Sequence, residues 1–232
     1  MSKRNKLQKF SEIYAFPHVY ENFNAKDPKL AGKDGEIVER KGQWAVKHFQ
    51  NNNPITLELA CGKGEYTLGL ARRYPNRNFI GVDIKGARIW KGAKTALEED
   101  LKNVAFLRTR IEQLHYFFEP AEVAEIWITF PDPFLKKENR RLTAPRFLEM
   151  YQQLLPSSGL LHLKTDSPDL YAFTLEVLQT VETFQLIYEA NDIYSQALFT
   201  PELDIKTFYE RMHLADQRTI KYIRMQAKQL NS

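Results

Sequence analysis

The stretch TLELACGKG at residues 56–64 predicts a buried strand that breaks into a glycine turn. A second predicted strand, NFIGVD at residues 78–83, ends on Asp83, 21 positions after Gly62. Gly62 and Gly64 allow a tight turn and a close approach to a ligand, and a carboxylate at Asp83 suits both hydroxyls of a ribose. Together the two stretches predict a cradle for a nucleotide cofactor; the simpler alternative is an ordinary strand, turn and helix with chance glycines.

The residues around the turn also bear on which cofactor it holds. A dinucleotide fingerprint requires a third glycine three places after Gly64, but Thr67 stands there, and Glu58 lies just before the turn. A carboxylate that faces the ligand repels a pyrophosphate and attracts a cation. S-adenosylmethionine, which carries a sulfonium and an ammonium group, therefore fits this turn better than NAD.

Composition limits the class of protein. With 232 residues, of which 43% are hydrophobic, the chain is long enough for one α/β domain with a full core. A single cysteine excludes a disulfide framework, and the five histidines are too scattered to pair as metal ligands. We find no long apolar run and no signal sequence at the start, so we expect a cytoplasmic, metal-free protein without a membrane segment. The net charge of +4 leans only mildly toward polyanionic partners.

The first 35 residues differ from the rest. Basic residues such as Lys3, Arg4 and Lys9 alternate there with aromatic residues such as Phe10 and Phe23. Such a mixture can follow a phosphate backbone and stack on bases, and it is equally typical of a poorly ordered terminus. We predict an N-terminal arm over residues 1–35, with flexibility left open, and a single catalytic domain over residues 36–232.

Strands and helices alternate through that domain. Strands are expected near residues 56–59, 79–84, 104–107, 125–130, 160–164, 184–190 and 219–225, and helices at 37–49, 66–74, 87–101, 146–155 and 171–181. This rhythm predicts an α/β fold with a mostly parallel, twisted sheet of about seven strands and helices on both faces. The last two strands have no predicted helix between them, which indicates an antiparallel pair at one edge.

Ligands of parallel sheets lie outside the carboxyl ends of the strands, so the residues that follow each strand are candidates for chemistry. Asp132 follows the fourth strand between Pro131 and Pro133, which hold it still, although a plain surface turn is the alternative. Asp166 follows the fifth strand and is either a helix cap or a ligand. The basic run at residues 136–141 reads as a phosphate clamp or as a solvated loop.

These motifs, in this order, resemble the tRNA (guanine-N7-)-methyltransferase family. The resemblance runs from about Phe10 to the end and is carried by FPDPF at residues 130–134 with its basic tail, by the glycine turn, by Thr165 and Asp166, and by TFYE at residues 207–210. It implies a Rossmann-like class I methyltransferase fold, S-adenosylmethionine as the cofactor, and tRNA as the substrate. It also implies methylation of N7 of the guanine at position 46 of the variable loop.

The resemblance carries over residue by residue. It implies that Glu58, Asp83 and Asp132 face S-adenosylmethionine, and that Asp132 is also catalytic. The remaining cofactor contacts are expected from Ala60, Gly62, Gly64, Ile84, Arg110 and Ile111. The target guanosine is expected to be held by Lys136, Asp166, Thr207, Phe208, Tyr209 and Glu210.

Three positions depart from the pattern of the family. Phe134 stands where tryptophan is usual, and the basic loop after it is shorter. Arg110 stands where an acidic residue is common, so we expect backbone atoms to hold the adenine. Ala60 replaces a glycine, which we expect to tighten the turn.

Other functions remain open from the residues alone. An aminomethyltransferase acting on adenine N6 or cytosine N4 also uses Asp-Pro followed by an aromatic residue, but normally with two adjacent prolines. A non-catalytic RNA-binding subunit that keeps the fold is a third reading. The sequence leaves monomer and homodimer undecided. Because N7 carries an exposed lone pair, the predicted reaction needs no proton removed, and Asp132 is expected to stabilise the positive charge that develops on the base.

Overall fold

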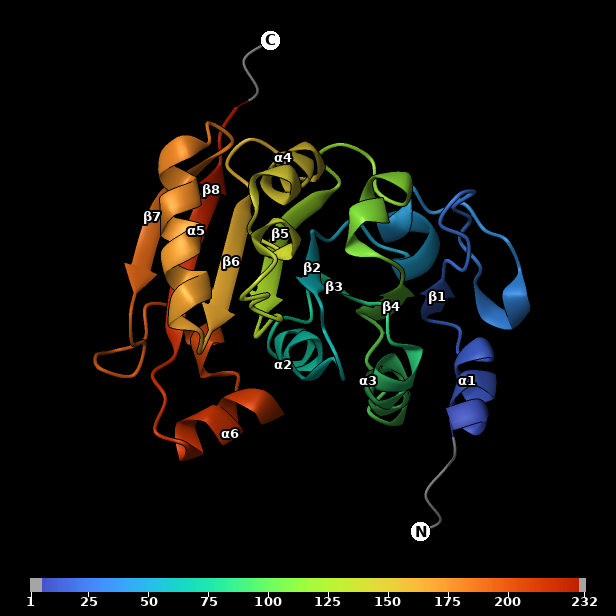
Figure 1. Ribbon diagram of the computed structural model, residues 1–232. Helices are drawn as coiled ribbons and strands as arrows, with labels where there is room; N and C mark the ends of the chain where they lie inside the picture. The colour runs from blue at the N-terminus through green and yellow to red at the C-terminus, as the bar shows by residue number, and fades with distance from the viewer. Residues whose placement is uncertain (1–5, 230–232) are drawn as a thin grey trace. The chain divides into compact units, whose positions relative to one another are not determined.

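The structure is a computed structural model that describes residues 6–229, and the chain divides into two compact units, Met1–Glu119 and Pro120–Ser232 (Figure 1). Lys3 and Arg4 of the predicted arm lie outside the described residues. The predicted α/β class is confirmed, with eight strands in the described part of the chain where about seven were expected. Within residues 6–229, no helix has both the length and the apolar character needed to cross a membrane.

The N-terminal unit is built on four parallel strands in the order β1-β4-β3-β2. They are β1 (Val19–Glu21), β2 (Ile55–Leu59), β3 (Asn78–Asp83) and β4 (Val104–Arg108). The helices are α1 (Lys6–Tyr14), α2 (Glu65–Arg73) and α3 (Gly86–Glu98), with short 3₁₀ segments at Lys33–Gly35 and Ile111–Tyr116 and a π-helical segment at Trp44–Phe49. Figure 1 shows α1 beside α3, an arrangement that their contacts bear out.

The strands of this unit are apolar along most of their length because both of their faces are covered. Leu57, Leu59, Ile80, Val82 and Phe106 have no exposed surface. Asp83 lies opposite Arg108 in the β3 and β4 pairing, which aligns the carboxyl ends of these two strands. The packed core thus sets where the strands end, and with it the position of the polar residues that follow them.

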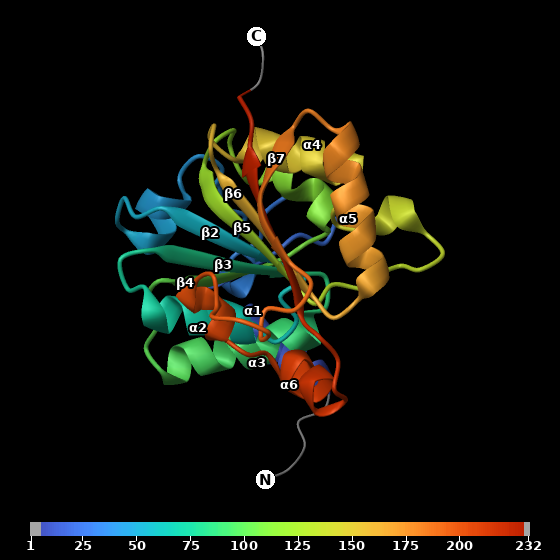
Figure 2. The ribbon, with the colours of Figure 1, turned by 90° about the vertical axis from the view of Figure 1, so that its left-hand side faces the viewer.

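The C-terminal unit has four strands in the order β5-β6-β8-β7. They are β5 (Val123–Thr129), β6 (Leu160–Thr165), β7 (Phe184–Ala190) and β8 (Lys221–Ala227), and the helices are α4 (Pro145–Leu154), α5 (Pro168–Thr180) and α6 (Phe208–Ala215), with 3₁₀ segments at Glu138–Arg140 and Pro201–Asp204. β5 and β6 run parallel, and β8 is antiparallel to both β6 and β7. Helix α5 packs against β6, β7 and β8 (Figure 2).

Three details differ from the predicted elements. The helix expected at residues 37–49 begins only at Trp44, because Gly42 adopts a left-handed conformation with φ of 69°. The extra strand, β1, comes from the predicted arm and pairs with β4, so this part of the arm belongs to the sheet of the N-terminal unit. Helix α6 lies between β7 and β8 in the chain, where no helix was expected, although the two strands do form the predicted antiparallel pair.

Candidate active site

The glycine turn after β2 uses three left-handed positions. Ala60, Gly62 and Gly64 have φ of 58°, 57° and 67°, and Gly64 immediately precedes α2. A Cβ added at Gly64 would lie 2.6 Å from Cε1 of Phe106, so glycine is required there by packing. A Cβ added at Gly62 would meet no atom within 4 Å, so the backbone at Gly62 borders open space. The turn is therefore closed on the side of β4 and open at Gly62.

Asp83 ties the turn to the end of β3. Its Oδ2 accepts a hydrogen bond of 2.9 Å from the backbone N–H of Gly62, and its Oδ1 accepts one of 2.7 Å from the backbone N–H of Lys85. The side chain is only 7% exposed. The structure thus brings Asp83 and Gly62 together as the sequence predicted, while the contact of Asp83 with a ribose stays a prediction.

Glu58 lies in surroundings that the sequence did not indicate. Its side chain is buried, and its Oε2 accepts hydrogen bonds from the backbone N–H of Thr67, at 2.8 Å, and from the Thr67 hydroxyl. Thr67 lies in the first turn of α2, where a carboxylate interacts favourably with the helix dipole. The predicted direct contact between Glu58 and a cofactor stays a prediction, and the sequence analysis did not foresee that Thr67 would hold Glu58.

The turn carries a concentrated negative charge. Burial raises the pKa of the Cys61 thiol well above its ordinary value, and the charges of Glu58 and Asp83 raise it further. Because both carboxylates act on the same buried thiol, they share one neighbourhood at the end of β2. The thiol stays protonated and is not a nucleophile at neutral pH.

Two of the predicted cofactor residues, Ile84 and Arg110, line a small cavity of the N-terminal unit. This cavity of about 230 Å³ is lined by Asn22, Phe23, Ala25, Ile84, Arg108, Thr109, Arg110 and Gln113. Ile84 is 53% exposed, and the backbone carbonyl of Arg110 accepts from the N–H of Gln113 at 3.0 Å. Ile111 begins the 3₁₀ segment that follows. Asn22 and Phe23 come from the predicted arm; the sequence analysis named Phe23 among the aromatic residues of the arm, but it did not point to Asn22 or place either residue at this cavity.

In the C-terminal unit, Asp132 lies on an exposed loop after β5. Its Oδ1 accepts from the backbone N–H of Phe134 at 3.0 Å, which is the turn geometry considered as an alternative from the sequence. Phe130 and Phe134 on either side have φ of 48° and 42°, and such strain in non-glycine residues is typical of functional loops. The loop is thus strained and presents Asp132 to solvent.

The basic run after Asp132 separates into two groups. Arg141 is 4% exposed, and its Nε donates to the carbonyl of Pro133 at 2.9 Å, so it supports the Asp132 loop from inside and is unsuited to a phosphate clamp. Lys136, Lys137 and Arg140 are exposed. Lys136 is therefore accessible, and its predicted contact with tRNA stays a prediction.

Asp166 is not the cap of α5, because Ser167 has that role and accepts from the N–H of Leu170 at 3.2 Å. The carboxylate of Asp166 instead accepts from Nη1 of Arg218 at 2.8 Å, and Nε2 of His213 lies 3.5 Å from its other oxygen. Of the two roles considered from the sequence, the cap is excluded. The predicted contact with guanosine stays a prediction.

The segment from Thr207 to Glu210 splits between structural and accessible residues. Thr207 caps α6 by accepting from the N–H of Glu210 at 3.2 Å. Glu210 has no exposed surface, and its carboxylate binds Nζ of Lys164 at 2.8 Å and the hydroxyl of Tyr194 at 2.7 Å. Phe208 and Tyr209 are 50% and 43% exposed. The expected contact of Glu210 with a base is thus limited by burial, whereas the two aromatic rings are accessible.

Within residues 6–229 there is no group of three or more His, Cys, Asp or Glu side chains placed to hold a metal ion.

Comparison with known proteins gives a consistent result. Residues 52–223 match the family described as "Putative methyltransferase". A tRNA (guanine-N(7)-)-methyltransferase of Christiangramia forsetii is 46% identical over 231 residues, covering 98% of this chain and 100% of the relative. One of Porphyromonas gingivalis is 48% identical over 210 residues, covering 90% of this chain and 84% of the relative.

Solved structures agree on the fold. The 16S rRNA methyltransferase KamB matches with a TM-score of 0.62 at 14% identity, covering 84% of this chain and 97% of that chain. TrmN of Thermus thermophilus matches with a TM-score of 0.54 at 20% identity, covering 80% of this chain and 47% of that chain. These likenesses show the fold alone. Because curated relatives of high identity match along nearly the whole sequence, the chain belongs to the tRNA (guanine-N7-)-methyltransferase family.

Proposed function

We propose that this protein transfers a methyl group from S-adenosylmethionine to N7 of a guanine in tRNA, giving 7-methylguanosine. The names of relatives that match over most of their length support the substrate and the reaction. The observation that carries the proposal is the turn after β2, where Asp83 holds the backbone of Gly62 and leaves an open face. The reaction belongs in the cytoplasm, where tRNA is found, and position 46 of the variable loop is the expected target.

The residues of the turn fit this cofactor. Gly62 leaves space that a side chain would fill, and the charges of Glu58 and Asp83 suit a cationic ligand. When bound, S-adenosylmethionine supplies a methyl group made electrophilic by the attached positive sulfur. Asp83, fixed by two backbone donors, still has acceptor capacity for ribose hydroxyls.

Glu58 acts on this site through its charge and by fixing the first turn of α2 through Thr67. The cavity beside Ile84 and Arg110 is the proposed place for the adenine, with the backbone of the segment after β4 as its polar partner. Asn22 and Phe23 complete that wall. The adenine end therefore depends on residues from two distant parts of the N-terminal unit.

The C-terminal unit supplies the residues proposed for the RNA. Guanine N7 attacks with its own lone pair, so the protein has to place the base rather than remove a proton, and placement alone is worth several kcal/mol. Asp132 would stabilise the positive charge that forms on the purine. Asp166 is proposed to accept from the N1–H and amino group of guanine, which adenine cannot match.

Other exposed side chains of the C-terminal unit are proposed to have supporting roles. Phe208 and Tyr209 offer rings on which a base extruded from the RNA can stack. Lys136 is proposed to contact a phosphate. Thr207 and Glu210 act indirectly, since the cap and the buried pair with Lys164 fix the start of α6.

The test is to incubate the protein with labelled S-adenosylmethionine and unmodified tRNA, digest the RNA and identify the methylated nucleoside. We expect 7-methylguanosine. Recovery of 6-methyladenosine or 4-methylcytidine would overturn the proposal in favour of an aminomethyltransferase. If calorimetry detects no binding of the cofactor, the protein is a non-catalytic subunit instead.

A further inference from the structure

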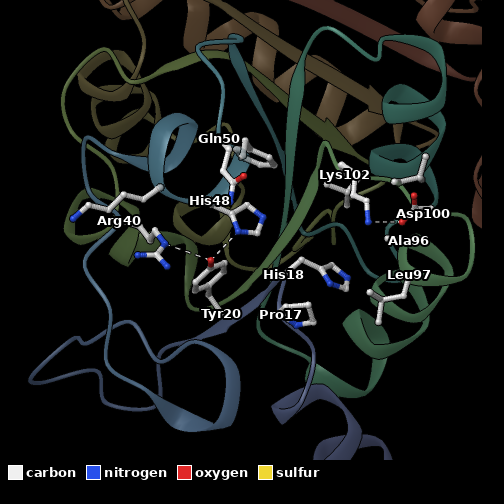
Figure 3. A pocket seen from close by; sticks show the side chains of 14 residues that line it. Pro17, His18, Tyr20, Arg40, His48, Gln50, Ala96, Leu97, Asp100 and Lys102 are labelled. Atoms are coloured by element: carbon white, nitrogen blue, oxygen red, sulfur yellow. Dashed lines mark hydrogen bonds and ion pairs between the residues drawn. The ribbon is translucent and has the colours of Figure 1, made fainter.

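A second hollow lies in the N-terminal unit, at the amino ends of β1 and β4 (Figure 3). Its volume of about 470 Å³ is within the range of small-molecule sites. Val104 begins β4 and His18 directly precedes β1, whereas the proposed cofactor turn follows the carboxyl end of β2. The five residues of β4 span roughly 16 Å at the usual rise, so the hollow is separate from the cofactor site.

One wall of the hollow is a fixed chain of hydrogen bonds. Nε of Arg40 donates to the hydroxyl of Tyr20 at 3.4 Å, and this hydroxyl lies 2.8 Å from Nδ1 of His48 (Figure 3). The guanidinium lies 5.5 Å from the centre of the Tyr20 ring, and Tyr20 is itself buried. Arg40 is therefore held in place by hydrogen bonding and by a cation–π contact.

Two basic residues that line the hollow, Arg40 and Lys47, give it positive charge. Arg40 makes its other hydrogen bond to the backbone carbonyl of Glu39, and Lys47 is exposed; neither forms an ion pair within residues 6–229. Burial lowers the pKa of His48 to about 4, and the nearby Arg40 contributes to the decrease. His48 is therefore neutral at pH 7, and the excess positive charge belongs to Arg40 and Lys47.

The opposite side of the hollow is largely apolar. Pro17 and Leu97 line the hollow there, and Leu97, on α3, is 45% exposed (Figure 3). Lys102 pairs with Asp100 on this side, so that charge is compensated (Figure 3). A ligand that fits has an anionic group for one wall and a flat or apolar group for the other.

We propose that this hollow binds a nucleotide, with its phosphate on Arg40 and Lys47 and its base against Pro17 and Leu97. A guanidinium matches the geometry of a phosphate, and a lysine adds a point charge. The nucleotide comes either from an unpaired stretch of RNA or from the free nucleotide pool. This site lies beyond the proposed methyl transfer and does not depend on it.

The first experiment titrates cytidine 5′-monophosphate into the full chain by calorimetry, with S-adenosylhomocysteine added in excess to fill the cofactor site. Cytidine shares no base with the cofactor or with guanine. We expect binding that weakens at least tenfold in Lys47→Glu and in Arg40→Gln and is unchanged in Lys91→Glu, an exposed lysine of α3 outside the hollow. Binding that is equal in all four proteins would place the nucleotide elsewhere and overturn the proposal.

The second experiment identifies the source. Affinity for unmodified tRNA is measured at several salt concentrations for the wild type, Lys47→Glu and Lys91→Glu. If RNA supplies the nucleotide, Lys47→Glu weakens binding and lowers the slope of log K against log salt by about one, and Lys91→Glu does not. If tRNA binding gives this result, the proposal stands even when free cytidine 5′-monophosphate binds weakly or not at all.

If the free nucleotide does not bind and Lys47→Glu behaves like Lys91→Glu toward tRNA, the proposal is wrong. Neither binding experiment measures methyl transfer, so their outcomes do not depend on which nucleoside the protein methylates. A protein that binds cytidine 5′-monophosphate here but does not make 7-methylguanosine would contradict only the proposed function.

Discussion

Two pairs of buried or half-buried acidic residues, one pair in each unit, are held in different ways. In the N-terminal unit, Asp83 and Glu58 accept from backbone N–H groups of the turn, of the residues after β3 and of α2. In the C-terminal unit, Asp166 and Glu210 are held by side chains 52 and 46 positions away, Arg218 and Lys164. Backbone donors come with the turn itself, whereas side-chain partners depend on the whole fold. We therefore expect the first arrangement to tolerate change in surrounding side chains better than the second.

The largest expected effect tests the buried pair of the C-terminal unit. Lys164→Ala leaves the carboxylate of Glu210 buried without its cation, and Lys164 also donates to the carbonyls of Leu203 and Ile205. We expect the free energy of unfolding to fall by about 3–5 kcal/mol, measured by urea denaturation. The control Lys206→Ala, whose partner Asp204 is exposed, is expected to cost less than about 1 kcal/mol. Equal effects of the two substitutions would contradict this view of the pair.

The next effect is on catalysis. Asp132→Asn keeps an oxygen that can accept from the N–H of Phe134, so the loop is preserved while the charge is lost. We expect kcat to fall by about 10²–10³ with little change in the KM for the cofactor. Asp169→Asn, on the exposed first turn of α5, serves as the control. Turnover within threefold of the wild type would remove Asp132 from the chemistry.

The matching substitution in the N-terminal unit has the opposite signature. Asp83→Asn replaces one oxygen that accepts from a backbone N–H with an amide group that cannot accept. We expect S-adenosylhomocysteine to bind about 10- to 100-fold more weakly by calorimetry, with kcat at saturating cofactor affected less. The exposed Asp34→Asn is the control. If Asp83→Asn lowers kcat and leaves binding intact, the division of work between the two units is wrong.

Acid is expected to weaken the N-terminal unit through His18. Burial lowers the pKa of His18 to about 4, although its bond of 3.0 Å to the carbonyl of Ala93 opposes the decrease. Unfolding raises this pKa toward its ordinary value near 6.5, so the unfolded chain binds the proton first. The stabilisation is complete above pH 6.5 and is lost as the pH falls toward 4, by about 2 kcal/mol at pH 5.

The measurement for this prediction is urea denaturation at pH 7 and pH 5. His18→Gln should remove about 2 kcal/mol of the difference between the two conditions, while the exposed His115→Gln should leave that difference unchanged. An identical pH dependence of both variants would show that His18 is not the responsible group.

The smallest expected effect concerns the turn itself. Ala60 has φ of 58°, a conformation that costs an L-residue about 1–2 kcal/mol and glycine almost nothing. Because glycine also gives the unfolded chain more freedom, Ala60→Gly should raise the free energy of unfolding by less than about 1 kcal/mol. The control Ala172→Gly, at an exposed position in the interior of α5, should lower it by about 1 kcal/mol. A clear loss of stability in Ala60→Gly would mean that the methyl group of Ala60 contributes packing.

Local pattern was enough to predict the parallel strands, the glycine turn and the antiparallel edge pair, because hydrophobic runs and glycines act on their own segment of chain. It did not predict β1, since three residues of an aromatic and basic segment become a strand only when β4 offers its edge. It also did not predict the burial of Arg141 and Glu210. A charged residue in a hydrophilic run looks exposed until its distant partners are known.

By itself the sequence determined the class of fold, the family and the pairing of Asp83 with the turn, because each depends on short stretches whose spacing sets the backbone. The tertiary structure alone decided which charges are accessible. Asp132 and Lys136 face solvent, whereas Glu58, Arg141 and Glu210 are enclosed with specific partners. The physical reason is that burying a charge is favourable only when a donor or counter-ion meets it, and those partners are brought together only when the chain folds.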